Sequence, residues 1–290
     1  MKVFLVDGTY ELFRHHFAVP AHRNAAGEPV AAVRAVLGSI VGMLEDGVTH
    51  LGVATDHVIE SFRNDLWPGY KTGAGIDPDL RVQFEPLEDG LRALGVVVWA
   101  MVDVEADDAL AAAARQAAAD PRVEQVLVCT PDKDLAQCVE GDRVVQFDRR
   151  KGVVCDAAGV VERLGVPPAS VPDYLALVGD SADGFPGLPG WGAKSAAAVL
   201  TRYGRLEDIP ADAADWDVAV RGADKLARVL AEERDHAFLF RDLATLRTDV
   251  PLGTEVDDLR WVGPAPGFRD VLDRLDASRV AERVDRLTPK

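Results

Sequence analysis

The first 150 residues alternate between short apolar runs and longer amphipathic stretches, and this alternation limits the possible folds more than any other feature. The apolar runs that predict strands lie at 3–6, 50–55, 96–102, 123–130 and 143–147. The stretches that predict helices between them lie at 30–46, 79–94 and 106–118. Strands separated by helices predict an α/β fold on a parallel sheet, because parallel neighbours need a crossover connection.

The character of the sequence changes near residue 166. Glycine and proline gather in 179–192, GDSADGFPGLPGWG, and the later stretches 223–246 and 268–287 have helical patterns without clear strands. We therefore predict an α/β domain over 1–165 and a mainly helical domain over 166–290. With 290 residues, 48% of them hydrophobic, the chain is long enough for both to bury a core.

Composition narrows the class of protein. No apolar run approaches the ~20 residues of a membrane span, and the start, MKVFLVDGTY, lacks the pattern of a signal peptide. Cys129, Cys138 and Cys155 form no CxxC pair and indicate reduced thiols in a cytoplasmic protein. The net charge of −16 argues mildly against a protein that coats nucleic acid, although an enzyme with carboxylates in its site needs only local basic patches.

Acidic residues follow the predicted strands where these end. Because the carboxyl ends of parallel strands share one edge of a sheet, we expect these acids to converge. Asp180 and Asp183 add a pair spaced i, i+3, which shares a face if that turn is helical. Asp56 also ends a strand, but we interpret it as a cap or turn residue. The expected set is Asp7, Glu105, Asp107, Asp108, Asp132, Asp134, Asp180 and Asp183.

Eight converging carboxylates repel one another strongly, and divalent metal ions would relieve that repulsion. With no cluster of histidines or cysteines, the ligands are hard oxygens, which favour Mg²⁺ or Mn²⁺ over Zn²⁺. The chemistry indicated is phosphodiester hydrolysis with two ions ~3.5–4 Å apart. Single members have a structural alternative: Asp107, Asp108, Asp132 or Asp134 can cap a helix, and Asp7 can be a turn residue.

Several segments, in order along the chain, resemble the 5′-nuclease family, which contains the 5′→3′ exonuclease domain of bacterial DNA polymerase I, free-standing homologues and flap endonucleases. The matching segments are VDG (6–8), FRNDLWPGYK (62–71), EADDALA (105–111), TPDKDLAQ (130–137), GDSADGFPGLPGWGAKSA (179–196) and 225–252. The resemblance implies a PIN-like domain, a helix–three-turn–helix element, and cleavage of DNA at a 5′ end or 5′ flap beside duplex. It also implies two or more Mg²⁺ or Mn²⁺ ions, a role in DNA replication or repair, and a monomer, here without a fused polymerase domain.

The resemblance also assigns roles to particular residues. The eight acids match the metal ligands of the family, and Lys71 matches its lysine at the scissile phosphate. Arg63 matches a nearby arginine, and Tyr10 falls near an aromatic position of the first loop. Ala74 stands where the family has an arginine that grips the 5′ strand, so we expect a weaker hold on that strand.

The glycine-rich segment predicts a duplex anchor. Glycines permit tight turns and a close backbone approach, and a helix that begins near Lys194 would present free N–H groups to a phosphate. The residues concerned are Gly187, Gly190, Gly192 and Lys194. By resemblance this hairpin also holds a monovalent cation, commonly K⁺.

Three other functions stay open at this point. A PIN-type ribonuclease shares the fold, but such enzymes are usually shorter and lack the hairpin. A catalytically weak DNA-binding relative would be expected to lose some of the acids. A phosphatase for small molecules explains the acids but not GLPGWGAK.

Overall fold

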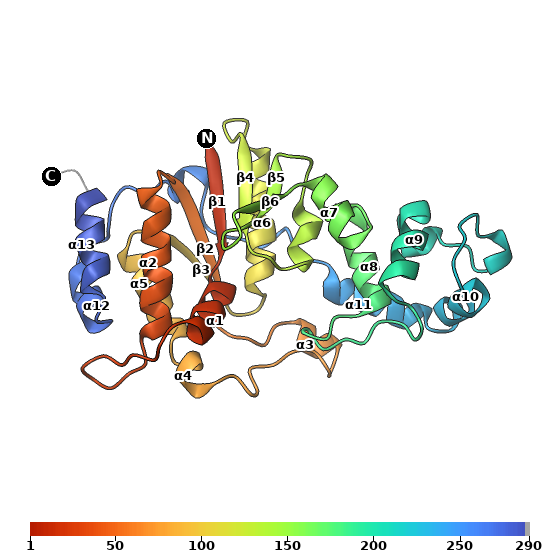
Figure 1. Ribbon diagram of the computed structural model, residues 1–290, viewed down its shortest axis with the longest axis horizontal. Helices are drawn as coiled ribbons and strands as arrows, with labels where there is room; N and C mark the ends of the chain where they lie inside the picture. The colour runs from red at the N-terminus through yellow and green to blue at the C-terminus, as the bar shows by residue number, and fades with distance from the viewer. Residues whose placement is uncertain (288–290) are drawn as a thin grey trace. The chain divides into compact units, whose positions relative to one another are not determined.

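The computed structural model describes residues 1–287 and divides into two compact units (Figure 1). The first contains 1–59, 73–130 and the described residues from Thr248 onward; the second contains 60–72 and 131–247. These units group the chain differently from the predicted division between residues 165 and 166, which stays a prediction.

Four parallel strands form the sheet of the first unit, in the order β3-β2-β1-β4. They are β1 (Lys2–Asp7), β2 (His50–Asp56), β3 (Val97–Met101) and β4 (Gln125–Cys129). The central strand β1 pairs Val6 with Val53 on one side and with Cys129 on the other. Helices cover both faces of such a sheet, which explains why its strands are continuous apolar runs. The predicted parallel α/β architecture is confirmed.

Helices from both ends of the chain surround this sheet. They are α1 (Gly8–Ala18), α2 (Ala31–Glu45), α4 (Pro78–Arg81), α5 (Phe84–Ala93), α6 (Ala106–Ala119), α12 (Phe268–Arg274) and α13 (Ser278–Leu287). The C-terminal helices α12 and α13 pack against α5 and α2 (Figure 1). In α2 the buried side chains recur at helical spacing, as in Val33, Leu37 and Ile40. No helix within residues 1–287 is both long and apolar enough to cross a bilayer.

Two helices predicted in this unit are interrupted. The helix predicted over 79–94 is split into α4 and α5, because Pro86 cannot donate a backbone hydrogen bond and its ring clashes with the preceding turn. The buried Gln83 at the break accepts from the N–H groups of Ala32 and Val33 and so caps α2. The helix predicted over 268–287 is split at Asp276, which has a left-handed backbone (φ +51°) and bonds His22.

The second unit is mainly helical. Its helices are α3 (Arg63–Leu66), α7 (Ala157–Leu164), α8 (Val171–Val178), α9 (Ala193–Tyr203), α10 (Ala223–Glu232) and α11 (Arg234–Ala244), so that the helix predicted over 223–246 is also divided. A small antiparallel pair, β5 (Val144–Asp148) and β6 (Val153–Cys155), precedes α7, and β6 was not predicted. The core contains Phe185 stacked on Phe240, with ring centroids 5.8 Å apart.

The turn between α8 and α9 is held against the segment 60–72. The indole N–H of Trp67 donates to the carbonyl of Gly184 (3.0 Å), and the backbone N–H of Lys71 donates to the carbonyl of Asp183 (2.9 Å). Gly184 has φ +84°, and a Cβ there would lie 2.0 Å from the carbonyl oxygen of Gly69. The two segments therefore approach as closely as they do only because residue 184 is glycine.

We expect Gly184→Ala to lower the free energy of unfolding by about 3 kcal/mol or more, since a left-handed backbone conformation and a backbone clash both oppose it. Gly204→Ala is the matched control: φ is +81° and nothing lies within 4 Å of an added Cβ, so a cost of about 1–2 kcal/mol is expected. Urea unfolding of both variants measures the difference. Equal losses would show that the contact with Gly69 is loose.

Candidate metal centre

Three acids of the predicted set gather in the second unit. Asp134, Asp180 and Asp183 are all buried, and each offers a carboxylate oxygen within 4.8 Å of the others. Asp134 begins the short 3₁₀ helix Asp134–Cys138, and the other two belong to the turn between α8 and α9. The structure thus brings together residues that lie almost 50 positions apart in the sequence.

A tight turn, and no helix, positions Asp180 and Asp183. Asp180 and Phe185 exchange two backbone hydrogen bonds (2.9 and 3.0 Å), and the Asp180 carboxylate accepts from the N–H of Ala182 (2.9 Å). The helical face considered for their i, i+3 spacing is therefore absent. The pair still reaches Asp134 because the turn closes on itself.

Asp134 carries the strongest sign of a missing partner. Its Oδ1 atom is buried and makes no hydrogen bond with the described residues, and the nearest cation, Lys133 Nζ, is 3.9 Å away. Burial raises the pKa of the Asp134 carboxyl well above its ordinary value, and the charges of Asp132 and Asp183 raise it further. A buried carboxylate oxygen without a donor costs free energy, which a bound cation would offset.

Two lysines neutralise part of this charge. Lys133 Nζ donates to Asp180 Oδ2, and Lys71 Nζ lies 2.9 Å from Asp183 Oδ1. Burial lowers the pKa of Lys133, but the hydrogen bond to Asp180 and the neighbouring carboxylates outweigh burial, so this pKa lies above its ordinary value. Lys71 thus lies at one acid of the group, and its role at the scissile phosphate stays a prediction.

Asp132 differs from its neighbours because it is exposed. Its carboxylate accepts from the backbone N–H of Asp134 (3.0 Å), which is the local bond expected of a residue that begins a helical turn. The capping interpretation therefore describes one contact of Asp132. It does not describe Asp134, because the N-cap position of this 3₁₀ helix is held by Lys133 and Asp134 is the first residue inside it.

The other four acids lie in the first unit, at the carboxyl edge of its sheet. Asp7 ends β1 and accepts from the N–H of Tyr10 (2.8 Å) and the hydroxyl of Thr130 (3.0 Å). Glu105, Asp107 and Asp108 form the start of α6. Glu105 and the fully buried Asp108 cap this helix reciprocally. Asp7, Glu105 and Asp108 are thus caps by geometry, while the convergence of all eight acids in one site stays a prediction.

Asp56 explains how the start of α6 reaches that edge. Its side chain accepts from the N–H of Ala106 (2.7 Å), so the last residue of β2 holds the first turn of the helix. This agrees with its interpretation as a capping residue. Asp56 consequently helps to position the acids at the start of α6, although it is not one of the predicted metal ligands.

Arg63 has a clear structural function. It is buried, its Nε donates to the carbonyl of Leu243 (2.8 Å), and its Nη2 donates to that of Thr245 (3.1 Å). These carbonyls end α11, where the helix leaves acceptors unpaired. The contacts therefore give Arg63 a helix-capping role, and its catalytic role stays a prediction. Tyr10 is half-buried in the first turns of α1, and Ala74 is exposed.

The glycine-rich hairpin presents an open helix end. Gly187 (φ +68°) is enclosed by backbone atoms of 177–179, whereas Gly192, directly before α9, has nothing within 4 Å of an added Cβ. Lys194 in the first turn of α9 is exposed. Lys225 of α10 lies beside Gly190, with its Nζ 4.0 Å from the position of an added Cβ. Lys225 begins the matched segment 225–252, but the sequence did not place it beside Gly190, which is 35 residues away.

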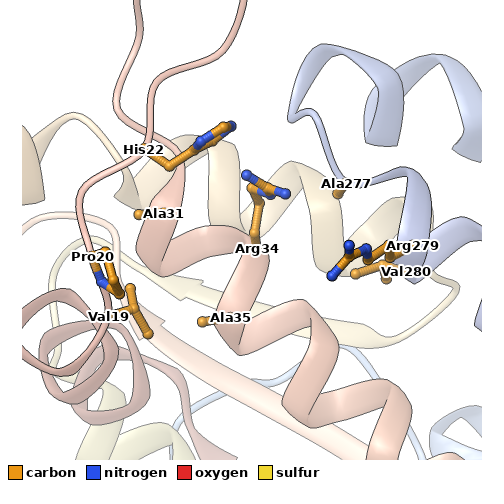
Figure 2. A pocket seen from close by; sticks show the side chains of 9 residues that line it. All are labelled: Val19, Pro20, His22, Ala31, Arg34, Ala35, Ala277, Arg279 and Val280. Carbon is orange, nitrogen blue, oxygen red and sulfur yellow. The ribbon is translucent and has the colours of Figure 1, made fainter.

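A separate cleft in the first unit, of about 300 Å³, has a different chemistry (Figure 2). Side chains of the loop after α1, of α2 and of α13 line it, among them His22, Arg34 and Arg279. Asp276, outside the lining, bonds His22 and lies 3.6 Å from Arg34. No lining residue is acidic, so this cleft offers no carboxylate ligand to a metal ion.

The residues present fit a divalent ion. Opposite ligands of an octahedral Mg²⁺ lie ~4.2 Å apart, and the three carboxylates span little more than this. Asp134 Oδ1 supplies an oxygen that accepts no hydrogen bond from any donor in residues 1–287. All three ligands are hard oxygens, which suit Mg²⁺ or Mn²⁺.

Comparison with known proteins identifies the family and agrees with the fold. The sequence matches the family profile described as 5′-3′ exonuclease, N-terminal resolvase-like domain over residues 2–165, and that described as 5′-3′ exonuclease, C-terminal SAM fold over 166–266. DNA polymerase I of Pseudomonas aeruginosa is 38% identical over 88% of this chain, which spans only 28% of that polymerase. The 5′-3′ exonuclease of Buchnera aphidicola is 26% identical, over 89% of this chain and 90% of the relative.

Two solved structures of the bacteriophage T5 enzyme share the fold. One, with zinc bound, has a TM-score of 0.65 at 19% identity and covers 98% of this chain and 100% of the T5 chain. The other, a complex of the flap endonuclease with DNA and metal ions, has a TM-score of 0.62 at 19% identity, over 99% and 98% of the two chains.

Fold and site together define an α/β protein with a resolvase-like domain, a helical SAM-fold domain and a buried carboxylate centre. The chain belongs to the 5′-3′ exonuclease family, as its resemblance to 5′-nucleases predicted.

We expect Asp134→Asn to stabilise the metal-free protein, because it removes a buried negative charge beside two others. A gain of about 1 kcal/mol corresponds to a rise of roughly 2–4 °C in Tm for a chain of this size. Mg²⁺ should raise the Tm of the wild type and have less effect on the variant. Asp224→Asn, at an exposed acid of α10, controls for net charge. A lower Tm in EDTA would identify Asp134 as a structural acceptor.

Proposed function

We propose that this protein is a divalent-metal-dependent 5′-nuclease that hydrolyses phosphodiester bonds of DNA, as a 5′→3′ exonuclease and flap endonuclease. The observation that carries the proposal is the buried group of Asp134, Asp180 and Asp183, with an unpartnered oxygen on Asp134. Three buried like charges in one place destabilise the fold through their mutual repulsion, so they do not serve to stabilise it. In a chain of the 5′-3′ exonuclease family, binding of a metal ion accounts for them.

The relatives support the activity to different degrees. The Buchnera exonuclease matches over nearly its whole length, so the similarity covers a free-standing exonuclease. The matched DNA polymerase I sequences are much longer than this chain, and their similarity supports the nuclease part only. The T5 flap endonuclease, in a complex with DNA and metal ions, supports DNA as the substrate.

The residues of the chain have separable tasks in this proposal. The carboxylates of Asp134, Asp180 and Asp183 would hold a divalent ion, and the acids at the sheet edge of the first unit would hold a second. When bound, such ions supply a nucleophile at neutral pH and stabilise the charge that develops on the leaving oxygen. Lys71, whose backbone is fixed by Asp183, would place its ammonium group at the scissile phosphate and stabilise the transition-state charge.

We propose Mg²⁺ or Mn²⁺ as the working ion. The side chains of the group are all carboxylates, and Zn²⁺ usually takes nitrogen or sulfur ligands in proteins. The T5 5′-exonuclease structure with zinc bound shows that a protein of this fold also accepts Zn²⁺. Which ion this protein binds then depends on the type of its ligands and on how much Mg²⁺ is available around it.

The proposal is tested by cleavage of a 5′-flap DNA and of a single-stranded RNA of matching sequence, each with Mg²⁺ and with EDTA. We expect products only from the DNA and only with Mg²⁺. Cleavage of the RNA alone would support a PIN-type ribonuclease. Binding without cleavage would support a catalytically inactive DNA-binding relative, and equal activity in EDTA would exclude metal-dependent hydrolysis.

We further propose that the hairpin before α9 binds the duplex through its backbone. A helix N-terminus attracts phosphate, and Lys194 and Lys225 beside it add positive charge to an otherwise acidic chain. K⁺ at this hairpin is the cation that the family resemblance suggests. Such contacts position the duplex without reading its sequence.

Gly192→Asp should therefore weaken binding of double-stranded DNA by about tenfold or more, because it places a carboxylate at the proposed phosphate site without a steric conflict. The maximal cleavage rate at saturating DNA should change little. Ala211→Asp, at an exposed position of the same unit, gives the same charge change away from the hairpin. Fluorescence anisotropy over a salt series measures both affinities, and equal affinities would remove the anchor assignment.

A further inference from the structure

Lys133 has a position that the proposed reaction leaves unexplained. It stands between two acids in the sequence, and its ammonium group bonds Asp180 across the turn while lying 3.9 Å from Asp134 Oδ1. The sequence pattern DKD gave a role to both aspartates and none to the lysine. The structure places its charge inside the carboxylate group.

The surroundings of Lys133 are unlike those of a surface lysine. Its side chain is 38% exposed, whereas Lys151, which pairs with Asp148 in the same unit, is 69% exposed. The carboxylate that Lys133 bonds is only 5% exposed. A partly buried ammonium on a buried carboxylate is screened less by water than an exposed pair, so its removal matters more.

We propose that Lys133 is the built-in counter-ion of the metal centre: its ammonium group holds Asp180 beside Asp134 in the metal-free protein and competes with the divalent ion for Asp180 Oδ2. This inference rests on the proposed metal-dependent function. Lys133 is thereby a positioning residue, since it acts on the ligands.

The competition follows from the hydrogen bond itself. The oxygen that Lys133 bonds belongs to one of the three carboxylates that can share an ion, so a close ion and the ammonium group repel each other. In the absence of an ion, the same ammonium group offsets the repulsion among buried carboxylates. The lysine therefore stabilises the empty centre and weakens the affinity of the loaded one.

Lys71 has a different place in the same group. It pairs with Asp183, and its backbone N–H is bonded to the carbonyl of that residue. The two lysines thus contact different acids of the turn. Lys133 also lies 3.9 Å from Asp134 Oδ1, which accepts no hydrogen bond from the residues that the structure describes.

The test compares Lys133→Gln with Lys151→Gln, which removes a lysine from an exposed ion pair and leaves the same net charge. Thermal melting is followed by circular dichroism in EDTA and over a Mg²⁺ titration. In EDTA, K133Q should have a lower Tm than K151Q. The Mg²⁺ concentration that gives half of the maximal Tm shift should be about threefold to tenfold lower for K133Q. Lys133→Arg, which keeps the charge, should restore the Tm in EDTA.

Each other outcome has a distinct meaning. If the wild type shows no Mg²⁺-dependent shift, the metal centre and the proposed function fail together. If the wild type responds and K133Q follows K151Q, the counter-ion role alone is overturned. A higher Mg²⁺ requirement in K133Q would also overturn it, because Lys133 would then assist binding of the ion. If K133Q is unfolded in EDTA, the Mg²⁺ concentration at which it refolds gives the same comparison.

Discussion

The mutual repulsion of buried carboxylates is the constraint on which the candidate site depends. Asp134, Asp180 and Asp183 are brought within 4.8 Å of one another, where water screens their charges poorly. Two ammonium groups, from Lys133 and Lys71, offset part of the charge. The remainder appears in the raised pKa of Asp134 and in its unpartnered oxygen. Such a site lowers the stability of the metal-free protein, and a bound cation would offset that loss by neutralising the carboxylates.

The surrounding structure is arranged to impose that proximity. The turn that carries Asp180 and Asp183 is closed by its own backbone hydrogen bonds. Gly184 lets the segment of Lys71 lie against this turn, and Trp67 fixes the contact with an indole hydrogen bond. Because these are backbone contacts and a half-buried aromatic ring, the carboxylates have little freedom to move apart. Precise placement of ligands and charges is the contribution a protein scaffold makes to metal chemistry.

Sequence patterns predicted the structural features that depend on neighbouring residues and missed those that depend on contacts between residues far apart in the chain. The strands were predictable because burial on both faces makes them uniformly apolar. The break between α4 and α5 follows from Pro86 and could have been anticipated. At the break before α13, Asp276 bonds His22, 254 residues away, and no local pattern indicates that contact. Helix α1 went unpredicted because Asp7, which caps it, was interpreted only as a metal ligand or a turn residue. The role of Arg63 was likewise hidden, because its acceptors belong to α11.

What the sequence determined by itself is the chemistry available to this protein: acids at the strand ends, no cluster of soft ligands, a glycine-rich hairpin before a helix, and the family to which these motifs belong. Those features are fixed by residue type and spacing. Tertiary structure alone decided which acids share one place and which cation stands among them. Asp134 and Asp180 are 46 residues apart in the sequence, and the fold brings the turn that carries Asp180 next to Asp134. Lys133 can bond Asp180 only in that arrangement. Coulomb energies depend on the distance between charges in space, and the number of residues between them in the sequence does not give that distance.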